Sequence, residues 1–308
     1  MALRISFKTS PQRVDWATLD ATWRLAGEQA AEPGGWDGAW LNDHLTDMRP
    51  DAPGPSLEAI TTLAALIHHV PGLRVGHGVL SNTFRHPVLL AKSAVVLDHA
   101  TGGNFVLGMG AGWFEGEHEP FGIPLPPIGE RIDRLVSAVE VLALLFSPEA
   151  AAAPGVTRDD PFYPLAGAVN SPAPLTPGGP PIILGGQKPR GIALAARQAA
   201  GWLMPGTDAG DLSYFIDRRD AILRALEAER RDPASFELIA QAHTGPSAAD
   251  RSRALAEARA MAGAGATELV IGVPAALGPA GLEAAQREVL APLRAEFGRV
   301  GRAPDPVP

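Results

Sequence analysis

The sequence predicts a (β/α)₈ barrel, a TIM barrel, with an irregular insertion before the fifth strand. Three observations support this fold class. Short apolar segments alternate with amphipathic segments eight times along the 308 residues, two of the apolar segments open into glycine-rich loops, and 46% of the residues are apolar, enough for one large core. A doubly wound sheet is the alternative, but it usually has fewer strands. We expect a single domain over residues 1–299 and a loose tail over 300–308.

The expected elements follow one another in regular alternation. The strands are short apolar runs and cover residues 3–7, 38–42, 74–80, 104–109, 181–185, 201–204, 236–242 and 268–273. The helices are amphipathic and cover residues 15–32, 56–69, 87–99, 130–146, 190–200, 211–231, 247–263 and 280–297. In the fourth helix, Ile132, Leu135 and Val139 recur on one helical face. Ser247, with Asp250 three residues later, predicts a capping box before the seventh helix.

Two connections are longer than the others. Residues 112–129 carry aromatic and acidic side chains, and this segment is long enough to form a wall or lid of a binding site. Residues 147–180 are rich in Ala, Pro and Gly. We expect this second segment to be an irregular excursion over the mouth of the barrel, with partial disorder as the alternative.

Composition excludes several classes of function. The net charge is −8 and no block of five basic residues occurs, so nucleic acid and anionic membranes are poor partners. Cysteine is absent, which excludes disulfides, thiolate catalysis and cysteine metal sites. No apolar run reaches the roughly 18 residues of a membrane span, and the N-terminal segment lacks the continuous apolar run of a signal peptide. We expect a cytoplasmic protein that acts on a small organic molecule.

Two glycine loops indicate a bound cofactor. Gly108, Gly110 and Gly112 alternate at the end of the fourth strand, and glycine lets backbone N–H groups approach a ligand phosphate or ring. A single loop of this kind is weak evidence, because a tight strand-to-helix turn has the same pattern. Gly185 and Gly186 repeat the pattern after the fifth strand, with a proline just inside the next helix. Two such loops on successive strands would hold a phosphorylated cofactor from two sides.

Polar residues end the second strand, at the barrel edge where active sites lie. Asp43 and His44 are placed to hold a cofactor and deliver a proton. The alternative is a polar strand end in which Asp43 satisfies backbone N–H groups and His44 is solvated. His77 lies within the third strand and fits a hydrogen-bonded interior residue better than a catalytic one.

Other kinds of site find little support in the sequence. The histidines lack metal-site spacing, and the Glu-His-Glu run at 117–119 fits a solvated loop better than a zinc site, so we expect no metal. No G-x-S-x-G elbow and no Walker loop occurs.

Several short motifs stand in a characteristic order along most of the chain. They are Asn-Asp-His at 42–44, Gly-His-Gly-Val at 76–79 with Arg-His-Pro at 85–87, the glycine loop at 105–113, Gly-Glu-Arg at 129–131 and the second glycine loop at 181–186. Together they resemble the bacterial luciferase-like monooxygenase family of flavin- and coenzyme F420-dependent oxidoreductases. The resemblance implies a (β/α)₈ barrel with an irregular insertion before the fifth strand, in agreement with the count of elements.

The resemblance also implies the roles of individual residues. In the F420 branch a cis peptide in a bulge of the third strand supports the cofactor ring, and by position this is Gly78–Val79 here. Asp43 would lie near the ring, and His44 would face the substrate side of the ring. Two backbone segments would hold the cofactor side chain and phosphate: Gly110, Ala111 and Gly112, and Gly185, Gly186 and Gln187.

Departures from the family pattern narrow the expected function. Members that oxidise a sugar phosphate carry a glutamate where this chain has Trp113, so we expect that acid chemistry to be absent. The favoured function is F420-dependent hydride transfer to or from a small organic substrate, with His44 exchanging the matching proton. The alternative is an FMN-dependent monooxygenase of the same family, and a minor alternative is a non-enzymatic flavin-binding barrel. Family members are often dimers, so we expect a homodimer.

Overall fold

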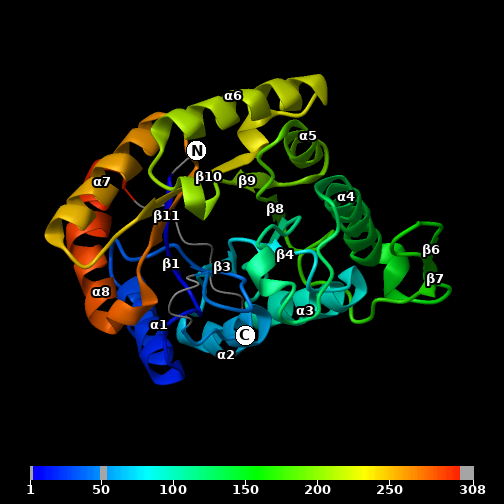
Figure 1. Ribbon diagram of the computed structural model, residues 1–308, viewed down its shortest axis with the longest axis horizontal. Helices are drawn as coiled ribbons and strands as arrows, with labels where there is room; N and C mark the ends of the chain where they lie inside the picture. Colours follow the sequence, from blue (N-terminus) through cyan, green and yellow to red (C-terminus); the bar gives the residue numbers. More distant parts are fainter. Residues whose placement is uncertain (1–2, 49–53, 299–308) are drawn as a thin grey trace.

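A closed ring of parallel strands forms the centre of the protein (Figure 1). The computed structural model describes residues 3–48 and 54–298, so the expected tail at 300–308 lies outside the described residues. The barrel strands are β1 (Arg4–Thr9), β2 (Gly38–Leu41), β3 (Arg74–His77), β5 (Phe105–Gly110), β8 (Ile182–Leu184), β9 (Gly201–Leu203), β10 (Glu237–His243) and β11 (Glu268–Gly272). Each pairs in parallel with the next, and the pairings of β3 with β5 and of β11 with β1 close the ring. The predicted eight-stranded barrel is confirmed.

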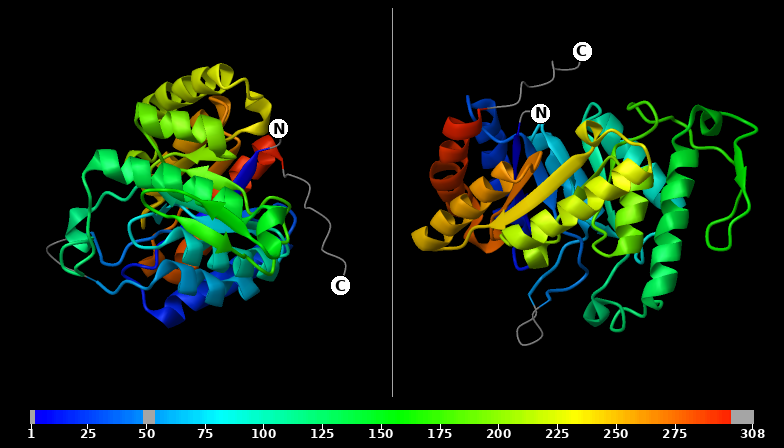
Figure 2. Two further views of the ribbon diagram at one scale, coloured as in Figure 1. Left: turned by 90° about the vertical axis from the view of Figure 1, so that its right-hand side faces the viewer. Right: turned by 90° about the horizontal axis from the view of Figure 1, so that it is seen from above.

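Helices surround the barrel on its outer side (Figures 1 and 2). They are α1 (Trp16–Ala31), α2 (Ala59–Leu66), α3 (Pro87–Ala100), α4 (Ile128–Leu145), α5 (Pro189–Gln198), α6 (Leu212–Ala228), α7 (Ala248–Gly263), α8 (Gly278–Ala285) and α9 (Ala291–Phe297). A π-helical turn, Gln286–Leu290, joins the last two, which together form the predicted eighth helix. The predicted capping box of Ser247 and Asp250 is present at the start of α7. None of the helices in the described ranges is long and apolar enough to cross a membrane.

Side chains alternate between two apolar layers along each strand. Outward-facing residues pack against the helices; Phe7, for example, lies edge-on to the rings of Trp23 and Trp36 at 5.5 and 5.7 Å. Inward-facing residues form a smaller cluster inside the barrel, made of Trp40, Val106, Ile183, Leu203, Ile239 and Val270. The helices cover the outer face of the strands and the inner cluster covers the other face, so the barrel strands are buried on both sides.

A polar network closes the amino end of the barrel, below the inner apolar cluster. Glu268, at the start of β11, accepts hydrogen bonds from Ser6 Oγ at 2.6 Å and Trp40 Nε1 at 2.9 Å. Arg74, at the start of β3, lies 3.1 Å from Glu268 and 2.6 Å from Glu237. These charges are buried but paired, so this end of the barrel is filled and held together by the protein's own groups.

The insertion before the fifth barrel strand lies beside the barrel. Its two short strands, β6 (Val156–Arg158) and β7 (Leu165–Ala168), pair antiparallel. The segment that follows them is bound to α3: Lys92 Nζ donates to the carbonyl of Ser171, and Asp98 accepts from the backbone and hydroxyl of Thr176. Figure 1 shows the hairpin outside the ring of helices, next to α3 and α4. The expectation that this insertion covers the barrel mouth is therefore wrong, because its polar groups find their partners on the outer helices.

Candidate active site

The third barrel strand is interrupted within residues 74–80, the range that the sequence predicts as one strand. β3 ends at His77, and the chain pairs again with β5 only at β4 (Leu80–Ser81). The peptide bond between Gly78 and Val79 is cis, as the family resemblance implied. A Cβ atom on Gly78 would lie 2.9 Å from Leu203 Cδ2, so a larger residue at this position would have to displace the Leu203 side chain.

Two of the predicted loop glycines face the bulge. A Cβ atom on Gly110, at the end of β5, would lie 2.9 Å from Val79 Cγ2, and one on Gly185, after β8, would lie 3.2 Å from the same atom. The Val79 side chain therefore fits between two glycines on neighbouring strands. The absence of a side chain at Gly110 and Gly185 thus makes room for Val79 of the bulge at the carboxyl ends of β5 and β8.

Two further loop glycines, Gly112 and Gly186, are required by the protein's own packing. Gly112 has φ +78°, and a Cβ atom there would lie 2.6 Å from Ser81 Oγ and 2.7 Å from Thr83 Oγ1. A Cβ atom on Gly186 would lie 2.8 Å from the Cα atom of Gly191 in the first turn of α5. Substituting either glycine would therefore disturb the fold as well as any ligand.

Each glycine loop accepts a hydrogen bond from an arginine of an outer helix. Arg131 of α4 donates to the carbonyl of Gly112, and Arg218 of α6 donates to the carbonyl of Gln187 at 2.8 Å. Ala111 lies between the two glycines of the first loop and is partly buried. The two predicted binding loops thus end neighbouring strands, β5 and β8, and are each tied to an outer helix.

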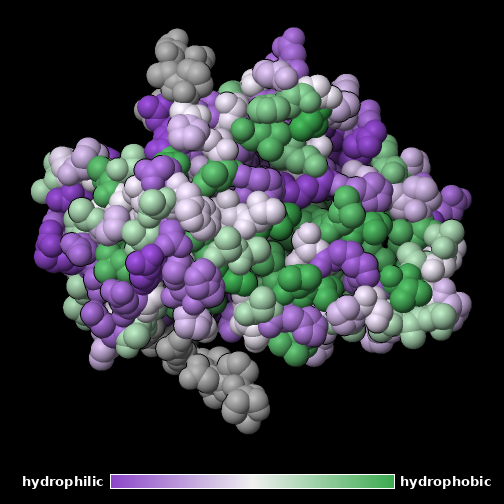
Figure 3. All heavy atoms as spheres, turned by 90° about the horizontal axis from the view of Figure 1, so that it is seen from below, coloured by the Kyte–Doolittle hydropathy of each residue, from purple (hydrophilic) through white to green (hydrophobic). Residues whose placement is uncertain are grey.

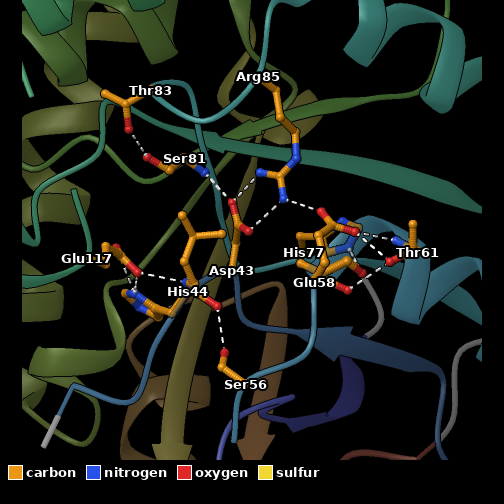
Figure 4. Close-up of polar contacts among 12 residues, drawn as sticks. Asp43, His44, Ser56, Glu58, Thr61, His77, Ser81, Thr83, Arg85 and Glu117 are labelled. Carbon is orange, nitrogen blue, oxygen red and sulfur yellow. Dashed lines mark hydrogen bonds and ion pairs between the residues drawn. The ribbon is translucent and has the colours of Figure 1, made fainter. Parts of the chain in front are cut away.

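Asp43 forms an ion pair at the end of β2 (Figure 4). Its carboxylate accepts two hydrogen bonds from Arg85, at 2.6 and 2.8 Å, and one from the backbone N–H of Ser81 at 2.7 Å. Arg85 also pairs with Glu58, whose carboxylate caps α2 through the N–H of Thr61. Burial raises the pKa of Glu58, but the hydrogen bonds from Arg85 and Thr61 outweigh it and lower that pKa to about 2. Asp43 therefore fixes the end of β2 to β4 and to the start of α2.

His44 is held in place by a carboxylate and by aromatic rings. Its Nδ1 atom lies 3.1 Å from both carboxylate oxygens of Glu117, and its side chain is 13% exposed. The rings of Trp113 and Phe114 approach it edge-on at 6.1 and 6.4 Å. The hydroxyl of Ser56 donates to the His44 carbonyl at 2.8 Å. The alternative in which His44 is simply solvated is wrong.

The loop at 117–119 is not the solvated loop that the sequence suggested. Glu117 and His118 are each only 2% exposed. Glu117 accepts from the backbone N–H of Leu45 at 2.9 Å, and His118 Nε2 lies 2.7 Å from Thr83 Oγ1. A short 3₁₀ turn, Glu115–Glu117, brings the loop back to the end of β2. Glu117 is thus a site residue that sequence analysis missed, because its partner is 73 positions away.

His77 is an interior residue, as the sequence indicated. It is fully buried, and its Nε2 atom lies 3.1 Å from the carbonyl of Ala59. Burial lowers the pKa of His77 to about 4, so the ring is neutral near pH 7. Across the described ranges, no group of three His, Asp or Glu side chains is arranged to hold a metal ion.

Comparisons with known proteins agree with this architecture. An F420-dependent glucose-6-phosphate dehydrogenase of Kribbella flavida is 29% identical over 178 residues, which is 58% of this chain and 50% of that protein. The chain thus spans about half the length of this relative. Other relatives are named as an F420-dependent hydroxymycolic acid dehydrogenase and a 4-hydroxyprotoasukamycin monooxygenase.

Solved structures share the fold over nearly the whole chain. An F420-dependent secondary alcohol dehydrogenase in complex with an F420–acetone adduct has a TM-score of 0.77 at 15% identity, covering 97% of this chain and 100% of that one. A riboflavin lyase with modified FMN and riboflavin also has a TM-score of 0.77, at 17% identity, covering 99% and 94%. Residues 5–303 match the family model described as luciferase-like monooxygenase, so this chain belongs to that family.

Proposed function

We propose that this protein is a coenzyme F420-dependent oxidoreductase that transfers hydride to or from a small organic substrate. One observation carries the proposal: the third strand is interrupted by a bulge at Gly78–Val79, and Val79 packs against Gly110 and Gly185, the glycines at the ends of β5 and β8. The cofactor ring is proposed to lie against this bulge, with the glycine loops that follow β5 and β8 beside it. Relatives named as F420-dependent enzymes support this cofactor over FMN.

The two glycine loops are the proposed binding segments for the cofactor side chain and phosphate. The carbonyls of Gly112 and Gln187 accept hydrogen bonds from Arg131 and Arg218, which hold the two loops in place, and backbone N–H groups of glycine loops are common anion ligands. Lys188 follows the second loop as an exposed cation at the start of α5, where the helix dipole also favours an anion. Gly110 to Gly112 and Gly185 to Gln187 are therefore assigned to the cofactor.

His44 is the proposed proton donor and acceptor, and Glu117 is the group that orients it. When bound, reduced F420 supplies a hydride from its ring. A carboxylate at Nδ1 favours the tautomer with a proton on that nitrogen, which leaves Nε2 as the atom that exchanges a proton with the substrate. Trp113 and Phe114 limit the access of water to the ring of His44.

Two measurements test this proposal. Fluorescence titration of the purified protein with F420 and with FMN is expected to show tight binding of F420 alone. Single-turnover oxidation of F420H₂ by a panel of ketones, aldehydes and enones is expected to slow about 10²- to 10⁴-fold in His44→Ala, with little change in the dissociation constant of F420. The exposed His68 gives a matched control, His68→Ala, which should react like the parent. An unchanged rate in His44→Ala contradicts the assignment.

An FMN-dependent monooxygenase is the second candidate, because solved structures of this fold include one with modified FMN. Binding of FMN without F420, together with oxygen-dependent turnover, would replace the first proposal with this one. Binding of either cofactor with no turnover of any donor or acceptor would favour a non-enzymatic flavin-binding barrel.

We also propose a homodimer that forms through the outer face of α3. Leu89 and Val96, two turns apart on this helix, are 67% and 63% exposed, and Leu175 of the adjacent insertion is 50% exposed. Figure 3 shows an apolar area over this half of the molecule. An exposed apolar area of this kind is typical of an interface. Light scattering should show a dimer for the parent and a monomer for Leu89→Glu, while Trp16→Gln on α1 should leave the mass unchanged.

A further inference from the structure

Three polar side chains lie inside the carboxyl end of the barrel, on strands across from the glycine-lined side. We call Lys8, Gln241 and His243 the Lys8 cluster. Lys8, on β1, is 5% exposed, and its ammonium group donates a hydrogen bond to the side-chain oxygen of Gln241 on β10. The amide nitrogen of Gln241 donates to the carbonyl of Met204, which turns the amide oxygen toward Lys8. His243 follows two residues later, on the same inward face of β10.

The Lys8 cluster contains a donor or acceptor that no protein group satisfies. His243 Nε2 is buried and has no hydrogen-bond partner in the part of the chain that the structure describes. A Cβ atom on Gly272 would lie 2.4 Å from His243 Cδ2, so the ring is held closely on that side. Buried polar atoms normally form hydrogen bonds, so we expect this nitrogen to bind a ligand atom.

The same cluster contains a buried cation without a counter-ion. Lys8 makes no ion pair with a carboxylate among the described residues, and burial lowers its pKa to about 8. Burial, followed by the charge of Lys8, lowers the pKa of His243 to about 3. The imidazole is therefore neutral and does not compete with Lys8 for an anion. An unpaired buried ammonium is costly, and the cost is recovered when an anion binds.

The backbone at Gly206 leaves space next to both groups. A Cβ atom built there would stand 3.5 Å from Lys8 Nζ and 3.6 Å from His243 Cε1, which is ordinary van der Waals contact. A carbon-sized atom therefore fits beside the ammonium and the imidazole together. Lys8, Gly206, His243 and Gly272 all lie at or after the carboxyl ends of their strands, where barrels of this kind bind ligands.

We propose that Lys8 and His243 form a subsite that binds a carboxylate group of the substrate. Lys8 supplies the charge, His243 supplies an N–H donor at Nε2, and Gln241 positions the ammonium. The carboxylate belongs to the substrate only if the proposed oxidoreductase function holds; the binding of a carboxylate at these residues does not depend on it. The expected substrate is thus an organic acid whose reacting carbon lies between the Lys8 cluster and the glycine-lined side.

The chain offers a direct spectroscopic test, because it contains only three lysines: Lys8, Lys92 and Lys188. Benzoate is the probe, added to cofactor-free protein that carries ¹³C-labelled lysine. We expect the Lys8 signal alone to shift and to saturate with benzoate. We expect Lys8→Met to weaken benzoate binding at least tenfold in calorimetry. Lys92→Met, a change at an exposed lysine on α3, should leave it unchanged.

Each outcome decides the proposal. No saturable shift of the Lys8 signal in the parent protein overturns it, and this arm holds even if Lys8→Met does not fold. Equal benzoate affinity in the parent and in folded Lys8→Met also overturns it. A tenfold loss of F420 affinity in Lys8→Met with unchanged benzoate binding would assign Lys8 to the cofactor instead. F420 titration of the parent tests the proposed function separately. If the parent does not bind F420, the proposed function is wrong, but the benzoate measurement still tests the carboxylate subsite.

Discussion

Replacing Lys8 by methionine is expected to stabilise the protein at neutral pH. The change removes a buried cation that has no carboxylate partner in the described part of the chain, and it keeps an unbranched side chain of similar length. A residue retained for ligand binding often opposes folding, whereas a residue retained for structure supports it. The sign of the stability change therefore separates the two roles of Lys8.

The size of the effect follows from the titration of Lys8. Burial lowers its pKa from 10.5 to about 8. As the pH falls through 10.5, the unfolded chain takes up a proton that the folded protein does not accept until about pH 8, so stability is lost over this range. At about 1.4 kcal/mol per unit, the full penalty is about 3 kcal/mol. Losing the hydrogen bond to Gln241 costs about 1 kcal/mol, so the net gain at pH 7 is about 2 kcal/mol.

Urea unfolding at pH 7 and pH 10 measures this difference. At pH 10 most of the penalty has disappeared, so the gain from Lys8→Met should fall to about zero. Titrating groups other than Lys8 and His243 contribute equally to both proteins and cancel, and His243, with a pKa of about 3, is neutral in the folded parent at both pH values. Lys188→Met is the control and should match the parent at both pH values. A gain of equal size at the two pH values, or a loss of stability at pH 7, would refute the view of Lys8 as an uncompensated buried charge.

Three further predictions concern the site and its stability. Glu117→Gln should slow hydride transfer about tenfold in stopped-flow measurements, with F420 affinity unchanged, because the amide no longer supports a charged imidazole at His44. A variant that transfers hydride as fast as the parent would show that Glu117 has no role in the reaction. Gly110→Val should weaken F420 binding with a modest loss in melting temperature, whereas Gly186→Val should mainly lower the melting temperature, because its side chain meets the backbone of α5; the reverse pattern would contradict the loop assignments. Lowering the pH from 6.5 to 5.5 should lower the free energy of unfolding by about 1 kcal/mol through His77, whose folded pKa is about 4. The reason is that the histidine of the unfolded chain binds a proton in this range and the buried one does not. If the free energy of unfolding of a His77→Leu variant falls as steeply with pH as that of the parent, His77 is not the cause.

The barrel could be predicted because each strand is a distinct apolar run. The family resemblance implied the bulge at Gly78–Val79, but not that strand pairing stops after His77, because residues 74–80 were predicted as one strand. The course of the insertion was also beyond prediction. Its composition shows an irregular segment, but contacts such as that between Asp98 and Thr176, 78 positions apart, decide where it lies.

The candidate site was predicted only where neighbouring residues carry the pattern. Asp43 and His44 stand out as a polar pair at a strand end, whereas Arg85 and Glu117 join them from 42 and 73 positions away. Lys8 was missed for a different reason. A polar residue in an alternating strand normally faces solvent, but the inner face of a barrel strand is enclosed, so the same pattern places Lys8 in the interior.

The polar network of Arg74, Glu237 and Glu268 also bears on which substitutions this protein can accept during evolution. It lies at the amino end of the barrel, and the inner apolar cluster separates it from the carboxyl end. Substitutions that alter ligand preference at the carboxyl end therefore leave these paired charges untouched. The two ends meet at Trp40, whose indole N–H donates to Glu268 and whose ring would lie 3.8 Å from a Cβ atom on Gly78, so we expect substitutions at Trp40 to affect both stability and the site.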